Sequence, residues 1–106
     1  MQKEERKILN QIKEIIKNRD PEAKVYLYGS RSRGTSSNDS DWDLLILLNK
    51  EQISPETEQK ITWPLYDLEF DTGEIISPMI YSQREWNNKY RLTPFYRNVM
   101  RDGILL

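Results

Sequence analysis

The chain alternates between amphipathic segments with helical spacing and short apolar segments typical of strands. In residues 1–18, Lys and Glu surround four isoleucines at helical spacing, namely Ile8, Ile12, Ile15 and Ile16. This pattern predicts a first helix. Pro21 disfavours helical backbone at the residue before it, so the helix should end there. The next segment, "VYLYG" at residues 25–29, is rich in β-branched and aromatic residues and predicts a short strand.

A polar connection, "SRSRGTSSNDS", separates this strand from a second one. The connection has room for one helical turn. Residues 41–48 consist mainly of an uninterrupted apolar run, which is typical of a strand buried on both faces.

A long helix is predicted after the second strand. Ser54 is suited to cap its first turn, and Pro55 is suited to its first position. Pro64 lies inside the helical pattern and should kink or split the helix. Gly73 is suited to end it in a left-handed conformation. We expect its buried side to contain Ile61, Trp63, Leu65 and Leu68.

The last third of the chain predicts one more strand and two helices. Pro78 lies inside the apolar segment 74–81, which favours an edge strand or a bulge. Ser82 and Glu85 form a capping-box pattern that opens a helix. A final helix should occupy residues 93–103. The order of elements predicts an α/β or α+β fold with a small mixed sheet flanked by helices.

Composition narrows the function classes. The 106 residues suit a single domain over residues 1–106, and a net charge of −1 gives no general attraction for nucleic acid or an anionic membrane. No apolar run reaches membrane-spanning length, and the first ten residues lack a signal-peptide apolar region. Together with the absence of Cys, this leads us to expect a cytoplasmic protein with neither membrane nor nucleic acid as partner. The absence of His excludes His-based catalysis and His-ligated metal, so any metal is held by oxygen, as Mg²⁺ or Mn²⁺ prefers.

Candidate chemistry lies where the second strand begins. Asp41 and Asp43 are two residues apart, so they share one face of the strand. Adjacent carboxylates repel unless a cation lies between them, which suggests a hard divalent metal. A bare pair of this kind is more often a turn cap and a solvated strand end. The turn at the end of the first strand, Gly29 and Ser30, changes this balance.

The Gly29–Ser30 turn has features of a phosphate-binding site. Gly29 allows a close backbone approach, and a helical turn starting at Ser30 would direct N–H groups at an anion. Arg31 and Arg33 add cations, although a solvated basic loop is an equally good interpretation of the two arginines. A phosphate-binding turn that faces an acidic pair is suited to transfer of a nucleotidyl group from a nucleoside triphosphate.

The segment "YGSRSRGTSSNDSDWDLLI" resembles the signature of the minimal nucleotidyltransferases of the DNA polymerase beta-like superfamily. That signature is an apolar residue, Gly-Ser, a spacer of about ten residues, and Asp-x-Asp between apolar residues. The resemblance implies that Gly29 and Ser30 bind the triphosphate. It also implies that Asp41 and Asp43 hold Mg²⁺. The implied substrate is a nucleoside triphosphate, with ATP as our expectation.

The family commonly supplies a third carboxylate from the next strand. In this chain we expect that position to hold Ser77, and we expect Glu74 to face the other side of the strand. Asp67, Glu69 and Asp71 are interpreted as a solvated helix face, although one of them could fold toward the site. Two functions follow: an active nucleotidyltransferase with an altered site, or a nucleotide-binding module that acts by binding a partner.

The resemblance also suggests partners. Small proteins of this family often pair with a HEPN-domain protein in toxin–antitoxin systems, where the nucleotidyltransferase adenylylates its partner. Tyr90, Phe95, Tyr96 and the tail "ILL" are best explained as core. The alternative is a surface for a partner or for a homo-oligomer.

Overall fold

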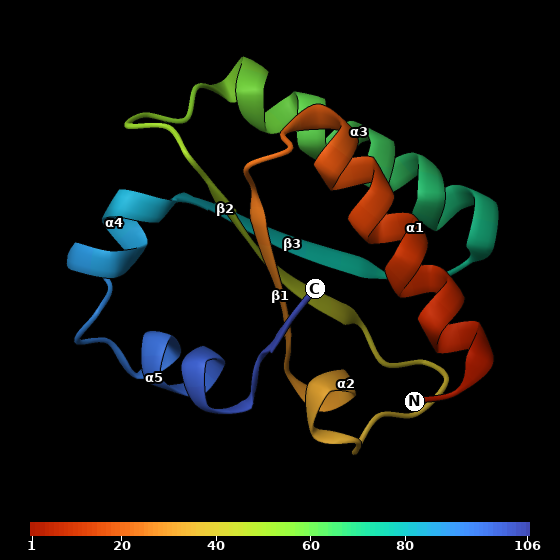
Figure 1. Cartoon of the computed structure of the whole chain (residues 1–106). Helices are drawn as coiled ribbons and strands as arrows, with labels where there is room; N and C mark the ends of the chain where they lie inside the picture. The colour runs from red at the N-terminus through yellow and green to blue at the C-terminus, as the bar shows by residue number, and fades with distance from the viewer.

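The computed structural model describes residues 1–106 as a four-stranded sheet with helices on both faces (Figure 1). The elements, in chain order, are α1 (Lys3–Arg19), β1 (Lys24–Tyr28), α2 (Ser30–Arg33), β2 (Trp42–Leu48), α3 (Pro55–Thr72), β3 (Ile76–Ser82), α4 (Gln83–Asn88), α5 (Pro94–Asp102) and β4 (Ile104–Leu105). The predicted α+β fold is confirmed. None of the helices is long and apolar enough to cross a bilayer.

The sheet has the strand order β3-β2-β1-β4 and is mixed. β2 pairs with β3 in parallel, and β1 pairs with β2 and with β4 in antiparallel orientation. The sheet position of β3 agrees with the edge strand predicted from Pro78.

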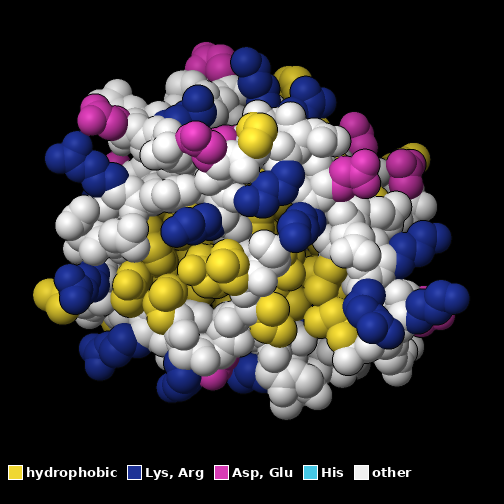
Figure 2. Space-filling model, viewed as in Figure 1, with side chains coloured by type: hydrophobic (Ala, Val, Ile, Leu, Met, Phe, Trp, Pro, Cys, Tyr) yellow, Lys and Arg dark blue, Asp and Glu magenta, His cyan; other side chains and the backbone are white.

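Strand β4 was not predicted. The tail that contains it pairs with β1, with Leu105 opposite Tyr26 and Ile104 opposite Leu27. Two residues are too few to show the period-two pattern of a strand. In Figure 2, hydrophobic side chains gather around this end of the chain, and Lys and Arg side chains surround them.

One face of the sheet, which we call the closed face, is covered by α1 and α3 (Figure 1). Alternate strand residues point to it because successive side chains in a strand lie on opposite faces. Its buried side chains are mostly aliphatic and include Ile12, Ile16, Val25, Leu27, Leu44, Ile46, Leu65 and Ile76. Trp42 lies among them, as the alternation around the two aspartates predicts.

The other face, which we call the open face, is covered only by the shorter helices α4 and α5 (Figure 1). Leu45 and Leu47 point to it, beneath Trp86 and Val99. Aromatic rings complete this cover: Trp86 lies 5.5 Å from Phe95 and 4.9 Å from Tyr96, between ring centroids. The prediction that Tyr90, Phe95 and Tyr96 belong to the core is confirmed, because all three are partly buried and pack against this cluster. The same prediction is wrong for most of the tail, because Ile104 and Leu105 are 40% and 55% exposed.

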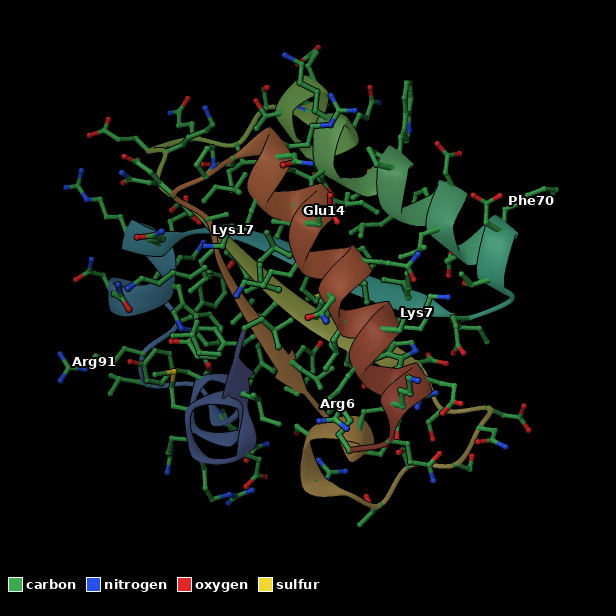
Figure 3. The ribbon with its side chains drawn as sticks, turned by 45° about the vertical axis from the view of Figure 1, so that its right-hand side comes forward. Arg6, Lys7, Glu14, Lys17, Phe70 and Arg91 are labelled. Carbon is green, nitrogen blue, oxygen red and sulfur yellow. The ribbon has the colours of Figure 1, made fainter.

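Helix α3 differs from one of the two alternatives predicted at Pro64 and from the predicted burial of one side chain. It continues without interruption from Pro55 to Thr72, so Pro64 does not split it. Trp63 was predicted to be buried but is 61% exposed, because it lies on the outer side of the helix with Tyr66 and Phe70. Figure 3 shows Phe70 projecting away from the sheet at the end of α3.

Candidate active site

The turn after β1 has the geometry that its sequence suggested. Gly29 has φ 78° and ψ −157°, a backbone conformation that residues with a side chain rarely adopt. Its carbonyl oxygen accepts hydrogen bonds from the N–H groups of Ser32 and Arg33, at 3.1 and 3.2 Å, and this starts α2. A Cβ atom at position 29 would overlap the carboxylate of Asp43. Glycine is therefore required both by the backbone and by the neighbouring acid.

The two aspartates lie together on the open face. In the sheet register, Asp43 is opposite Tyr28 of β1 and Ser77 of β3. The Ser77 hydroxyl donates a hydrogen bond of 3.3 Å to the Oδ2 atom of Asp41. Ser77 therefore lies beside both acids, where the sequence analysis placed the family's third carboxylate.

Neighbouring charges alter the protonation of this cluster. Burial and the charge of Asp41 raise the pKa of Asp43, and the positive charge of Arg33 partly opposes this rise. Burial, Asp43 and Tyr81 raise the pKa of Tyr28 to about 12. Negative charge is thus disfavoured at Asp43 in the absence of a cation, and a metal ion there would relieve the repulsion between the two carboxylates.

No third acid converges on Asp41 and Asp43. No group of three or more metal-ligating side chains converges anywhere in the structure. Glu74 lies toward the closed side of the sheet, where it accepts a hydrogen bond of 3.0 Å from the Trp42 indole. Glu69 accepts one of 2.7 Å from the Ile76 N–H. Asp67 and Asp71 are exposed on α3, as a solvated helix face predicts.

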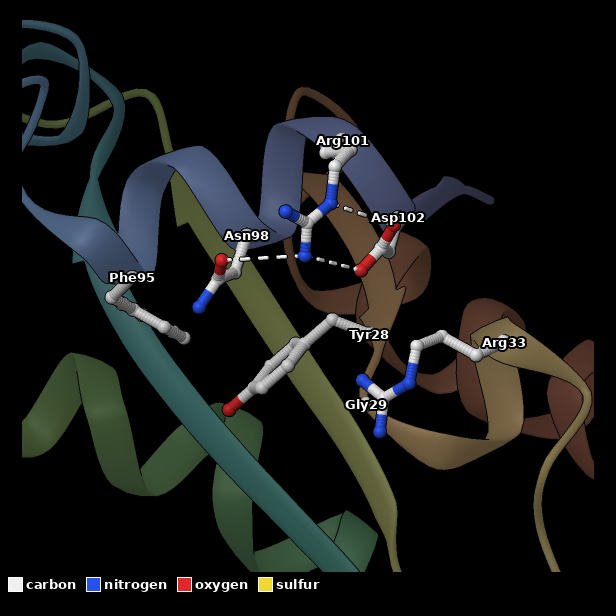
Figure 4. A pocket seen from close by; sticks show the side chains of 7 residues that line it. All are labelled: Tyr28, Gly29, Arg33, Phe95, Asn98, Arg101 and Asp102. Atoms are coloured by element: carbon white, nitrogen blue, oxygen red, sulfur yellow. Dashed lines mark hydrogen bonds and ion pairs between the residues drawn. The ribbon is translucent and has the colours of Figure 1, made fainter.

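A cavity of about 340 Å³ opens beside the Gly29 turn (Figure 4). Arg33 and Arg101 both line it, one from α2 and one from α5. Arg101 is paired with Asp102 at 3.0 Å and contacts Asn98 at 3.5 Å. The hydrogen bond from Arg101 is the main cause that lowers the pKa of Asp102, and the positive charges of Arg101 and Arg33 lower it further. The cavity wall is completed by Tyr28 and Phe95, whose ring centroids lie 5.3 Å apart.

The contribution of α5 to this cavity was not anticipated. Arg101 and Asn98 follow Gly29 by about seventy residues, and nothing local in "RNVMRD" distinguishes them from a solvated helix. The only available signal was their spacing of three, which places both on one side of a helix.

The structure separates the two arginines that the sequence placed together. Arg33 is exposed beside the cavity, but Arg31 is buried and does not line the cavity. The guanidinium group of Arg31 lies 4.0 Å from the centroid of the Trp42 ring. The structure therefore does not bring Arg31 to the aspartates as a free cation.

The chain belongs to the family described as polymerase beta, nucleotidyltransferase, because the family model matches residues 10–106. This match agrees with the class of protein that the Gly-Ser turn and the paired aspartates indicated. No match to a curated protein was found. Family membership supports nucleotidyl transfer as the general function.

Proposed function

We propose that this protein is a Mg²⁺-dependent nucleotidyltransferase that transfers AMP from ATP to a hydroxyl group of a protein or a small molecule. The observation that carries this proposal is the distribution of charge around Gly29. The carboxylate of Asp43 lies where a side chain at Gly29 would be. Gly29 also lines the cavity that contains Arg33 and Arg101, the latter paired with Asp102. A triphosphate with a bound cation has the matching distribution of charge.

The oxygen donors of the open face fit a hard divalent cation. Asp41 and Asp43 supply two carboxylates, and the Ser77 hydroxyl lies within hydrogen-bond distance of the first. Burial and the negative charge of Asp41 raise the pKa of Asp43, and bound Mg²⁺ would offset the repulsion from Asp41. When bound, the metal would polarise phosphate oxygens as a Lewis acid.

The chain's own groups would hold and orient the triphosphate. Arg33 and Arg101 would neutralise phosphate charge, and the absence of a side chain at Gly29 would let the backbone approach the phosphates. In the reaction, the acceptor oxygen bonds to the α-phosphorus while the bond to the bridging oxygen breaks and pyrophosphate leaves. Because no third acid converges on Asp41 and Asp43, the hydroxyl proton would pass to solvent.

Transfer of label from α-phosphate-labelled ATP tests this proposal. The purified protein is incubated with Mg²⁺ and with the product of its genomic neighbour, a candidate HEPN-domain partner. We expect AMP to become attached to that partner, as an antitoxin of this kind would require. A small polyol and the protein itself serve as alternative acceptors. Absence of both label transfer and pyrophosphate release with every acceptor, and with each of the four nucleotides, would contradict the proposal.

A second candidate function is nucleotide binding without turnover, in which the protein acts by occupying a partner's surface. The observation that favours it is Ser77, which is opposite Asp43 and cannot carry charge at neutral pH. Ser77→Asp separates the two functions. A third carboxylate at this position can assist deprotonation of the acceptor, an effect typically worth about 10²–10⁴-fold.

Transfer by the wild-type protein that increases in Ser77→Asp supports a weakened enzyme. Transfer that appears only in the variant supports the binding module. Ser77→Ala is the matched control, because it removes the hydroxyl without adding charge. If Ser77→Asp and Ser77→Ala behave alike, position 77 does not occupy the place of the third carboxylate.

A further inference from the structure

Arg31 belongs to the signature segment, but its side chain does not reach the cavity. Only 4% of it is exposed. Its Nε and Nη2 atoms both donate hydrogen bonds to the carbonyl oxygen of Ser40, at 3.1 and 2.8 Å. Ser40 directly precedes Asp41 in the chain. The guanidinium group therefore contacts the backbone immediately before the first aspartate.

The same guanidinium group also contacts the residue that follows Asp41. It lies 4.0 Å from the ring centroid of Trp42, at a distance suited to a cation–π interaction. The indole N–H of Trp42 in turn donates to Glu74, whose carboxylate lies 3.5 Å from Nη2 of Arg31. Ser40 and Trp42, the residues before and after Asp41, are therefore both held by contacts with the Arg31 guanidinium group.

The position of Arg31 is itself fixed from a third element. Glu5, in the first turn of α1, accepts a hydrogen bond of 3.2 Å from Nη1. A buried cation needs such partners, because an unpaired charge in this environment is strongly destabilising. Two carboxylates, the backbone carbonyls of Ser40 and Asn38 and an aromatic face therefore already occupy the donors and one face of this guanidinium.

The segment that Arg31 holds has little structure of its own. Residues 34–41 form no helix or strand before β2 begins at Trp42. Within the segment, Ser37 and Ser40 are connected by a backbone hydrogen bond of 3.1 Å and by one of 2.8 Å to the Ser40 hydroxyl. The only side-chain hydrogen bond that reaches the Asp41 carboxylate is the one from Ser77. The backbone around Asp41 is therefore held by the contacts of Ser40 and Trp42 with Arg31, together with the hydrogen bond of 2.8 Å from the Trp42 N–H to the Ile75 carbonyl oxygen.

We infer that Arg31 is a positioning residue that orients the Asp41 carboxylate from the opposite side of the sheet and does not bind phosphate. This inference rests on the proposed function, since it assigns Asp41 to the metal. Lysine cannot replace arginine in this role, because the planar guanidinium donates in several directions at once and stacks on an aromatic ring. Residues that orient a metal ligand typically change metal affinity about 10–100-fold when they are replaced.

Two arginine variants test the inference, with Arg84→Gln as control. Arg84 also forms an ion pair, but one that is exposed on both sides. Mn²⁺ affinity is measured by its electron paramagnetic resonance signal in the presence of ATP, and ATP affinity is measured separately in a chelator. We expect Arg31→Lys to weaken Mn²⁺ binding about 10–100-fold and to leave metal-free ATP affinity unchanged. Arg33→Gln should weaken metal-free ATP binding and leave Mn²⁺ affinity unchanged. Arg84→Gln should change neither the Mn²⁺ affinity nor the ATP affinity.

A measurement without ligand separates this inference from the proposed function. In amide NMR spectra of the metal-free protein, Arg31→Lys should shift the signals of residues 40–42 and raise their hydrogen exchange, and Arg33→Gln should not. Glu5→Gln, which keeps the arginine but weakens its anchor, should produce a smaller effect of the same kind if Arg31→Lys does not fold.

The inference is overturned if these amides are unchanged in both the Arg31→Lys and the Glu5→Gln variants, whatever the nucleotide experiments show. It is also overturned if Arg31→Lys weakens metal-free ATP binding as much as Arg33→Gln. Failure of the wild-type protein to bind Mn²⁺ and ATP would instead contradict the proposed function alone.

Discussion

The two faces of the sheet differ in how they are covered and in what that cover allows. The closed face carries a continuous aliphatic core under the two longest helices. The open face carries a smaller aromatic cluster under two short helices, which leaves the beginning of β2 accessible. Adjacent residues of one strand take part in both: Leu44 is buried on the closed face, and Asp43 is partly exposed on the open one.

This difference shows how a small domain holds two carboxylates in place without fully burying them. The strand that carries Asp43 is fixed by the packing of its alternate residues, Trp42 and Leu44, on the closed face. The aspartates themselves remain near water, where they can exchange a metal or a nucleotide. One side of β2 therefore packs into the core and stabilises the fold, and the opposite side carries the candidate metal ligand Asp43.

The largest effect is expected at the two aspartates. Asp41→Asn and Asp43→Asn should each reduce nucleotidyl transfer by more than the roughly 10–100-fold typical of residues that only support a metal ligand. The reason is that each change removes a charged oxygen donor. Asp39→Asn, in the same exposed loop, is the matched control and should keep full transfer. The measured quantity is kcat/KM for label transfer. Equal kcat/KM values in all three variants would show that the aspartates of the open face take no part in the reaction.

A pair of core substitutions separates the two faces. Ile12→Ala and Trp86→Ala should lower the free energy of unfolding by about 2–5 and 3–5 kcal/mol, because both side chains are fully or almost fully buried. Only Trp86→Ala should also weaken ATP binding, since Trp86 packs against Phe95 on the cavity wall. Urea unfolding and calorimetry on the same samples measure both quantities. If Ile12→Ala weakens binding equally, the faces are not independent.

Two glycines with a positive φ but different ψ angles, −157° at Gly29 and 17° at Gly34, help to separate backbone strain from steric overlap. Gly29 and Gly34 have φ 78° and 73°, but only Gly29 has a carboxylate where its Cβ would lie. Gly34→Ala should cost about 1–2 kcal/mol of stability and leave ATP affinity unchanged. Gly29→Ala should be at least as strained, because its φ and ψ lie in a region that is essentially restricted to glycine. It should also displace Asp43, so metal-dependent binding is lost. Equal binding by the two folded variants would show that Gly29 only relieves strain.

The smallest effect is expected from Asp43→Asn on stability in a chelator. Because folding raises the pKa of Asp43, the contribution of its protonated form is fully present below the ordinary carboxyl pKa. That contribution is lost as the pH rises through the higher, folded-state value. The asparagine variant does not ionise, so its melting temperature should exceed that of the wild type at neutral pH. The two should converge in acid, and a variant less stable than the wild type at pH 7 contradicts the assignment.

Local patterns predicted most of the fold. Periodicity and end signals located the helices and strands, since caps such as Ser54, Ser82 and Thr93 all accept the expected backbone hydrogen bonds. The family resemblance placed Ser77 beside the acids, and strand alternation placed Glu74 away from them. The prediction failed where a side chain's environment depended on distant elements, as for the exposed Trp63 and the short β4.

The two arginines illustrate why half of the site could not be predicted. Arg31 and Arg33 are equivalent by sequence, each one residue from a serine or glycine in a polar loop. Their different roles are set by Glu5, Trp42 and Glu74, which reach only Arg31. Arg101 approaches Arg33 only because α5 returns across the open face. These contacts are tertiary, and no local pattern contains them.

Paramagnetic line broadening by Mn²⁺–ATP tests the central claim most directly, because it locates a bound metal without requiring an acceptor. Amide signals of the protein are recorded before and after sub-stoichiometric addition of the complex. The account predicts strong broadening at Gly29, Ser30, Asp41 to Asp43 and Ser77, with the signals around Phe70 on α3 retained. Broadening centred on the acidic side chains of α3, or none beyond that caused by free Mn²⁺, would contradict a metal–nucleotide site on the open face.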